Sequence, residues 1–269
     1  MIDFDVRSIA AWGPGFGNWP ELVDGLRSGT WAQDVPLKPE RIPPRERRRS
    51  PQFVKMAVEV MSEACAAVDA DPADLAVVFA TAMSDMKTTD YMCRMLADTP
   101  AAVSPTRFHN SVNNAATGCW SIATGSRAPS NALCAFVHSA GMGLLEAATQ
   151  VMAEQRPVLL VVQDEASPTG LAHVCASSAG LALAVLLAPV GQGGEALAHW
   201  RLATAPGPTP AVALPDTLSA ACAGNPSADL LPFVLAHAEP ENKNRVLEIP
   251  LHAGLGLRLS RIGTAGGAA

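Results

Sequence analysis

The sequence is poor in charged and aromatic residues, which make up 16% and 5% of its 269 positions. Hydrophobic residues account for 49%, which excludes a disordered chain because disorder requires low hydrophobicity and high net charge. No apolar run approaches the roughly 18 residues of a membrane-spanning helix, so we expect no membrane span. The N-terminus has two early aspartates and no basic segment before an apolar stretch, which predicts no signal peptide. We therefore expect a cytoplasmic protein.

Motifs for cofactors, metals and nucleic acids are also missing. The six cysteines include no C-x-x-C pair, so buried free thiols are favoured over a metal site or disulfides. The sequence contains no GxGxxG motif, no P-loop and no histidine–carboxylate cluster, which predicts that no cofactor and no metal are needed. A net charge of −6 argues against nucleic acid as a partner. One local exception is a cluster of arginines, Arg41, Arg45, Arg47, Arg48 and Arg49.

Apolar segments alternate with amphipathic ones along the first 188 residues, which predicts an α/β fold with a covered sheet. We expect strands over residues 6–12, 75–81, 132–137, 157–162 and 181–187. We expect helices over residues 19–27, 52–67, 86–97, 113–124 and 141–153. Beyond residue 189 the pattern weakens and predicts strands over 195–204 and 245–250, helices over 214–223 and 228–237, a loop over 206–210 and a frayed tail.

Three segments in the middle of the chain follow one another in an order that carries a resemblance. They are RFHNSVNNAATGCWSIATG, PSNALCAFVHSAGMGLLEAATQV and PVLLVVQDE. Together with the opening strand–turn–helix and LAVVFATAMSDM, they resemble the N-terminal half of a β-ketoacyl synthase over about residues 4–188. The chain is most similar to a compact, ketosynthase-like N-terminal-domain family. Its members occur beside true ketosynthases in aryl polyene and xanthomonadin-type pigment pathways, as proposed chain-length-factor partners.

The resemblance implies a thiolase-like fold with one complete ketosynthase-type half and a truncated second half. Residues 1–188 would form the ketosynthase-like N-terminal domain. Residues 189–269 would form a shortened remainder packed on the same core.

A ketosynthase needs a cysteine nucleophile at a strand-to-helix turn, where the helix N-terminus lowers the thiol pKa and backbone N–H groups stabilise the oxyanion. Counting back from Glu165, which fits the acidic end of the family's next strand, places this position at about Val137. Cys134 lies three residues earlier and would face the other way on a strand. The family's two histidine motifs are not recognisable, and His237 and His252 are the nearest candidates. We therefore expect no catalytic residue.

The resemblance implies a noncatalytic chain-length-factor subunit. It would pair with an active β-ketoacyl synthase as a heterodimer, or with itself as a homodimer, during polyene or fatty acyl elongation on an acyl carrier protein. The candidate acyl-tunnel or interface residues are Phe108, Asn110, Asn113, Asn114, Trp120, Cys134, Phe136, Val137 and His138. In the alternative interpretation, Phe108 and Trp120 are core aromatics and the asparagines cap a helix.

Two further alternatives stay open. Arg45, Arg47, Arg48 and Arg49 are interpreted as a docking site for the acidic carrier protein, as a solvated loop, or as a group that pairs with acidic residues of a partner subunit. The chain itself is alternatively a catalytically active acyltransferase or thiolase-like enzyme that uses Cys134, or Ser139 with the adjacent His138.

Overall fold

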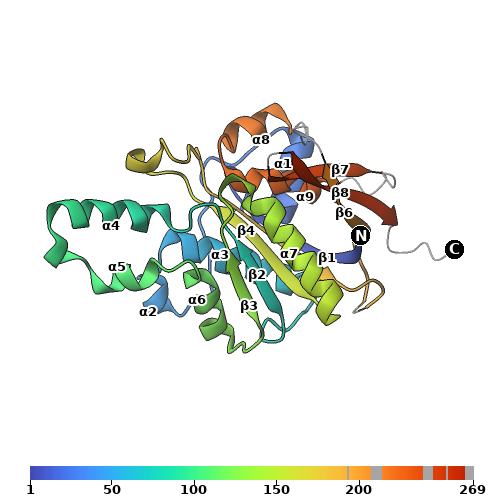
Figure 1. Ribbon diagram of the computed structural model, residues 1–269, viewed down its shortest axis with the longest axis horizontal. Coiled ribbons are helices and arrows are strands. Elements are labelled where there is room, and N and C mark those ends of the chain that lie inside the picture. The colour runs from blue at the N-terminus through green and yellow to red at the C-terminus, as the bar shows by residue number, and fades with distance from the viewer. Residues whose placement is uncertain (193, 207–213, 239–244, 253, 264–269) are drawn as a thin grey trace.

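One mixed sheet organises the protein in this computed structural model, which describes residues 1–192, 194–206, 214–238, 245–252 and 254–263 (Figure 1). The strand order is β3-β2-β4-β5-β1-β6-β8-β7. β2 pairs in parallel with β3 and β4, and the other pairings are antiparallel. The strands are β1 (Ile2–Trp12), β2 (Ala76–Ala80), β3 (Ser130–Leu133), β4 (Val158–Asp164), β5 (Leu181–Ala188), β6 (Ala198–Pro206), β7 (Val246–His252) and β8 (Leu255–Gly263).

Helices cover both faces of the sheet, so the central strands β2, β4 and β5 are buried along their whole length. α3 and α6 pack on one face, and α7, η4 and α9 pack on the other. α4 and α5 extend away from the sheet, to the left in Figure 1. The α-helices are α1 (Trp19–Ser28), α2 (Pro44–Arg47), α3 (Gln52–Ala66), α4 (Met86–Asp98), α5 (Pro105–Asn110), α6 (Ala115–Thr124), α7 (Ser139–Glu154), α8 (Asp216–Ala221) and α9 (Leu231–Leu235). Short 3-10 segments are η1 (Pro100–Ala102), η2 (Phe136–His138), η3 (Thr169–Leu171) and η4 (Pro226–Leu230).

Two glycines let α7 lie close to its neighbours. A Cβ at Gly143 would come within 2.6 Å of the Cβ of Ala80 in β2, and a Cβ at Gly141 would overlap the carbonyl oxygen of Pro250 in β7. Because α7 starts directly after β3 and η2, this packing brings the C-terminal strand β7 beside the turn between β3 and α7.

The α/β fold with a covered sheet is confirmed, but some element boundaries were predicted wrongly. The strand expected over 132–137 ends at Leu133, because the backbone turns into η2 and Phe136 adopts a φ of 52°. The helix expected over 228–237 is split into η4 and α9, with Pro232 in the first turn of α9. β8 and α5 were not predicted.

Two predictions fall on residues whose structure is not described. Residues 207–210 of the expected loop and residues 264–269 of the expected tail lie outside the described residues. The expected division of the chain at residue 188 stays a prediction.

Candidate functional site

The turn between β3 and α7 is held in an unfavourable backbone conformation. Phe136 has a φ of 52°, in the left-handed region, which costs of order 1–3 kcal/mol for a residue with a side chain. The buried Ser139 hydroxyl accepts a hydrogen bond from the Ala135 N–H at 2.8 Å. The same hydroxyl lies 2.9 Å from the Thr81 carbonyl oxygen and 2.7 Å from that of Phe136. The Ser139 hydroxyl therefore forms its hydrogen bonds with backbone groups at the turn and at Thr81.

Cys134 follows β3 and belongs to a small polar cluster. Its thiol donates to Asn113 Oδ1 at 3.2 Å and lies 3.7 Å from Ser84 Oγ. Ser84 donates to the same Asn113 oxygen at 2.6 Å, and Asn113 Nδ2 donates to the Ala132 carbonyl. Burial of the sulfur raises the pKa of the Cys134 thiol above its ordinary value. This environment favours the thiol over the thiolate that acyl transfer needs.

The two histidine candidates from the C-terminal part have different surroundings. His252 of β7 reaches the turn, where its ring centroid lies 6.2 Å from that of His138. His237 is partly buried at the edge of the core, where its Nε2 accepts a hydrogen bond from Trp200 Nε1 at 3.0 Å. Burial lowers the pKa of His237 to about 4. A neutral ring held in this way has a packing role.

Two adjacent carboxyl groups, Asp164 and Glu165, lie at the end of β4, and both are buried. Asp164 accepts hydrogen bonds from Thr81 Oγ1, the Ala82 N–H and Ser227 Oγ at 2.8–2.9 Å. Burial raises the pKa of Asp164 to about 6, against these three donors. Through these hydrogen bonds, the Asp164 carboxylate links the end of β4 to the residues after β2 and to η4.

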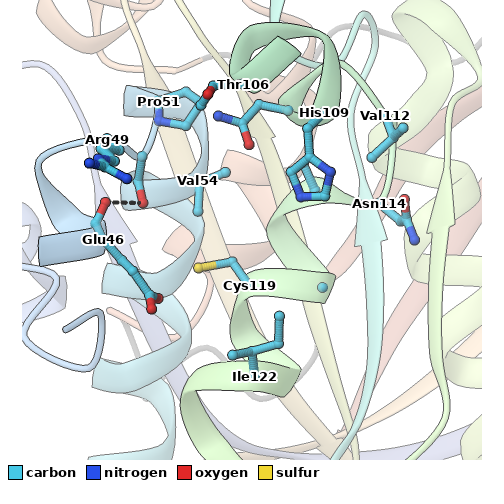
Figure 2. A pocket seen from close by; sticks show the side chains of 14 residues that line it. Glu46, Arg49, Pro51, Val54, Thr106, His109, Val112, Asn114, Cys119 and Ile122 are labelled. Atoms are coloured by element: carbon cyan, nitrogen blue, oxygen red, sulfur yellow. Dashed lines mark hydrogen bonds between the residues drawn. The ribbon is translucent and has the colours of Figure 1, made fainter.

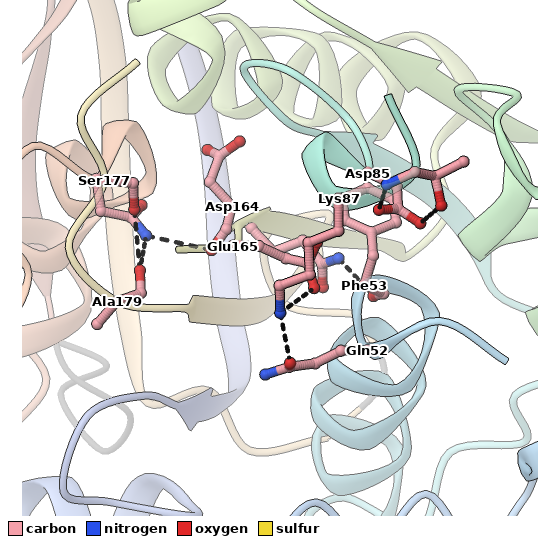
Figure 3. A network of polar contacts seen from close by, with 11 residues as sticks. Gln52, Phe53, Asp85, Lys87, Asp164, Glu165, Ser177 and Ala179 are labelled. Atoms are coloured by element: carbon pink, nitrogen blue, oxygen red, sulfur yellow. Dashed lines mark hydrogen bonds and ion pairs between the residues drawn. The ribbon is translucent and has the colours of Figure 1, made fainter. Parts of the chain in front are cut away.

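Glu165 lacks such donors. Its carboxylate lies 3.5 Å from the Lys87 ammonium, and neither oxygen accepts a hydrogen bond from a residue that the structure describes. Burial raises the pKa of Glu165 to about 7. Lys87 donates instead to Gln52 Oε1 at 2.8 Å (Figure 3). Both oxygens of the nearby Asp85 accept hydrogen bonds from Thr88.

A cavity of about 370 Å³ opens between α5, α6 and the start of α3 (Figure 2). Its wall is largely apolar, and volumes of about 300–1,000 Å³ are typical of small-molecule sites. The lining residues are Glu46, Arg49, Ser50, Pro51, Val54, Thr106, His109, Asn110, Val112, Asn114, Ala115, Gly118, Cys119 and Ile122.

A second cavity, of about 250 Å³, shares part of its wall with the first, namely Arg49, Pro51, Thr106 and Asn110. Its other lining residues are Gln52, Asp85, Lys87, Thr88, Arg107 and Glu165. The apolar cavity and the polar cavity are therefore adjacent, and Glu165 is a buried carboxyl in the lining of the polar one.

The structure distributes the predicted tunnel and interface residues over four environments: the core, the exposed surface, the cavity and the turn. Trp120 is fully buried in the core, whereas Phe108 is 63% exposed. Asn110 and Asn114 line the cavity, and Asn114 precedes α6 without capping it through its side chain. The remaining candidates, Asn113, Cys134, Phe136, Val137 and His138, gather at the turn.

The predicted carrier-protein cluster is likewise divided. Arg47 donates to the backbone carbonyls of Glu40 and Ile42, so it stabilises the loop before α2. Arg45 and Arg48 are exposed, and Arg49 lines both cavities.

Sequence reasoning missed the polar cavity. Glu165 was used only as the reference position for locating the nucleophile, and no role was predicted for Lys87 or Ser84. The available signal was a pair of carboxyl residues directly after the unbroken apolar run of β4, where a charge is buried unless the chain turns to solvent.

Two kinds of feature are absent from the described residues. No group of three or more His, Cys, Asp or Glu side chains there is arranged to hold a metal ion. Within the same residues, no helix has the length and apolar character that a membrane crossing requires.

Comparison with known proteins identifies the family of this fold. The sequence model described as Beta-ketoacyl synthase, N-terminal domain, matches residues 19–237. None of the curated proteins matches the chain.

Solved structures show the same fold at low identity. A chain from a ketosynthase (ApeO) in complex with its chain length factor (ApeC) from Xenorhabdus doucetiae has a TM-score of 0.71 and 19% identity, covering 97% of this chain and 100% of that chain. A chain of the ishigamide ketosynthase/chain length factor has a TM-score of 0.77 and 14% identity, covering 98% of this chain and 100% of that chain.

A longer relative aligns over only part of its length. A β-ketoacyl synthase from Burkholderia phymatum STM815 has a TM-score of 0.63 and 12% identity, covering 77% of this chain and 65% of that chain. The expected thiolase-like α/β fold, shorter than such a ketosynthase, is confirmed.

Proposed function

The chain belongs to the family of β-ketoacyl synthase N-terminal domains, and on this premise we propose that it is a noncatalytic chain-length-factor subunit. It pairs with an active β-ketoacyl synthase that elongates a polyene or fatty acyl chain on an acyl carrier protein. The single observation that carries this proposal is that the turn between β3 and α7 consists of Phe136, Val137 and His138, in the segment where the resemblance would place a nucleophilic thiol. The nearest thiol, Cys134, has a raised pKa and donates its proton to Asn113.

Exposed apolar groups near this turn support pairing with a partner. Phe108, Val112 and Ile122 on and beside α5 and α6 are 63%, 50% and 79% exposed. Phe136 and Val137 are also exposed, and β3 is an edge strand. An exposed edge strand beside apolar side chains favours association. A homodimer through the same surface is the alternative assembly.

The cavity beside α6 gives the subunit a means of measuring chain length. A chain that enters from a partner would end against Val54, Cys119 and their neighbours, because a filled cavity rejects further methylenes by overpacking. Arg45 and Arg48 supply exposed positive charge for an acidic carrier protein.

The test is co-purification with the neighbouring ketosynthase, followed by analysis of product length with and without this chain. Gly118→Leu is the informative variant, because Gly118 lines the cavity and a Cβ there meets no atom within 4 Å. Leucine is also a better helix former than glycine, so α6 should be kept. We expect intact pairing and a product shorter by at least one elongation unit.

Ala66→Leu is the matched control, since Ala66 is exposed at the end of α3 and outside the cavity. It should leave product length unchanged. Failure of the two proteins to associate, with the same product whether or not this chain is present, would contradict the proposed function.

A further inference from the structure

The two edges of the sheet differ in how they resist pairing with another chain. β7 forms one edge and contains Pro250, which has no N–H to donate, together with a register shift between Pro250 and His252. Prolines and irregularities of this kind protect an edge strand. β3 forms the other edge, and its sequence, SNAL, contains neither a proline nor a charged residue. The β3 edge is therefore the one that is open to a strand from another molecule.

A carboxylate from α7 lies beside the β3 edge. Glu146 Oε1 accepts a hydrogen bond from Asn131 Nδ2 of β3 at 3.1 Å and another from Gln150 Nε2 at 2.8 Å. Asn131 is exposed and Glu146 is half-buried. Two amide donors thus hold the carboxylate next to the middle of β3, and Glu146 forms no ion pair with a residue that the structure describes. Its negative charge is available to a group across the edge.

Pairing of two copies of this chain through β3 would place two such carboxylates close together. A two-fold axis perpendicular to the sheet makes the two strands antiparallel and leaves both α7 helices on the same side. With the axis at the middle of the strand, Asn131 lies opposite Ala132 of the other copy. Neighbouring side chains across such a pair are about 5–8 Å apart, so the two Glu146 carboxylates would be roughly 10 Å apart or less. Charges at this separation repel each other, because it does not exceed the Debye length of about 10 Å in 0.1 M salt.

Arg127 would not offset this repulsion, although it is the lysine or arginine closest to β3 in the sequence. In the antiparallel register described above, it would come opposite Phe136 of the other copy, beyond the end of β3. Glu146 lies beside the middle of the strand, where the axis passes. A homodimer would therefore keep two like charges next to its axis.

We propose that Glu146 selects the partner at the β3 edge, because it disfavours a second copy of this chain and favours a ketosynthase that presents a lysine or arginine opposite it. This inference rests on the proposed function for the pairing itself. It adds the charge that the partner must carry at this position. Like charges across an interface oppose the wrong partner, and opposite charges favour the right one.

The test mixes two forms of the full chain, wild type and Glu146→Lys, and therefore needs no ketosynthase. Each form carries its own fluorophore, and sedimentation velocity measures the dissociation constants of the mixed pair and of each form with itself. We expect the mixed pair to bind about tenfold more tightly than either form binds itself, because opposite charges replace like charges at the axis. In 1 M salt the difference should shrink, since the Debye length falls to about 3 Å.

Glu154→Lys is the matched control. It makes the same change of charge on α7, at the end of the helix, where the carboxylate pairs with Arg156. A mixture of Glu154→Lys with wild type should associate no more tightly than wild type with itself. Equal affinity in the three combinations of wild type and Glu146→Lys, or no association in their mixture, would overturn the inference.

A second measurement uses the neighbouring ketosynthase. Glu146→Lys should weaken its binding to that protein by about tenfold relative to wild type, and Glu146→Gln should lie between the two. If wild type and Glu146→Lys bind the ketosynthase equally, the inference fails while the proposed function stands. If the wild-type chain does not bind it and product length is unchanged, the proposed function fails, and the mixing experiment still reports on the charge of Glu146.

Discussion

Asp164 and Glu165 are neighbours in sequence and are both buried, yet their surroundings differ. Asp164 accepts three hydrogen bonds, whereas Glu165 accepts none from the described residues and has one ion pair. Successive side chains at the end of a strand point to opposite faces. Asp164 follows the side of β4 that packs against α7, and Glu165 follows the side that packs against α3.

The difference distinguishes a region whose polar groups bond to one another from a region that borders cavities. On the α7 side, the polar groups around the turn bond to one another, as Ser139 bonds to the backbone at Thr81. On the α3 side, the cavities leave Glu165 unsatisfied. The polar groups at the turn are thus bonded within the protein, whereas the Glu165 side of β4 borders a cavity.

The largest expected effect on stability comes from removing the Asp164 carboxyl group. Asp164→Ala leaves Thr81, Ser227 and the Ala82 N–H without their acceptor, so we expect a loss of about 3–5 kcal/mol in the free energy of unfolding. Glu165→Leu should change it by less than about 1 kcal/mol or increase it. Urea unfolding of both variants measures the difference. Equal destabilisation would mean that the two carboxyl groups have the same structural role.

The second effect is the dependence of stability on pH. The pKa of Glu165 is raised from 4.5 to about 7, which corresponds to about 3 kcal/mol. A raised pKa means that the folded state binds the proton more tightly than the unfolded state. Stability from this group is therefore present below pH 4.5 and is lost as the pH rises through 7.

Unfolding measured from pH 4.5 to 8 checks this prediction. Wild-type stability should fall over this range, and Glu165→Gln should remove the part of the fall that extends from about pH 6 to 7, above the range of Asp164. Glu154→Gln, at a partly exposed carboxyl that pairs with Arg156, is the matched control. A Glu165→Gln profile identical to wild type would show that Glu165 is already satisfied in solution.

The sequence predicts the buried strands well because their signal is local. The apolar runs of β4 and β5 are fully buried in the structure, as unbroken apolar segments in a covered sheet should be. The positive φ of Phe136 has no such signal, because phenylalanine rarely adopts it and the Ser139 contacts that hold it involve Thr81, far away in sequence. This is why the end of the strand at the turn was predicted four residues too late, at 137 instead of Leu133.

The polar cavity was unpredictable for a related reason. Whether Glu165 finds a donor depends on where α4 and α5 lie, and α5 was not predicted. The same dependence explains the arginines. Arg47 bonds to backbone groups five and seven residues away, whereas Arg49 lines the cavities. Composition alone does not distinguish these two roles.

The smallest expected effect concerns thiol reactivity on the turn side. Cys134 and Cys93 are both exposed, so the raised pKa of Cys134 and its hydrogen bond to Asn113 should decide their order. If Cys134 is not a nucleophile, it should react several-fold more slowly with iodoacetamide than Cys93. Peptide mapping during partial labelling at pH 7.5 measures the two rates, and Cys134→Ser identifies the signal.

The order in which Cys134 and Cys93 are labelled shows whether the Cys134 thiol is held by its hydrogen bond, as Asp164 is, or is free to react. Asn113→Ala removes the acceptor of the Cys134 thiol and should alter only that rate. Cys134 would instead be a nucleophile if it were the fastest thiol to react and if its alkylation abolished an acyl transfer activity of the chain alone. The noncatalytic proposal would then give way to an enzyme that uses Cys134. Slow labelling of Cys134 would agree with the proposed noncatalytic role.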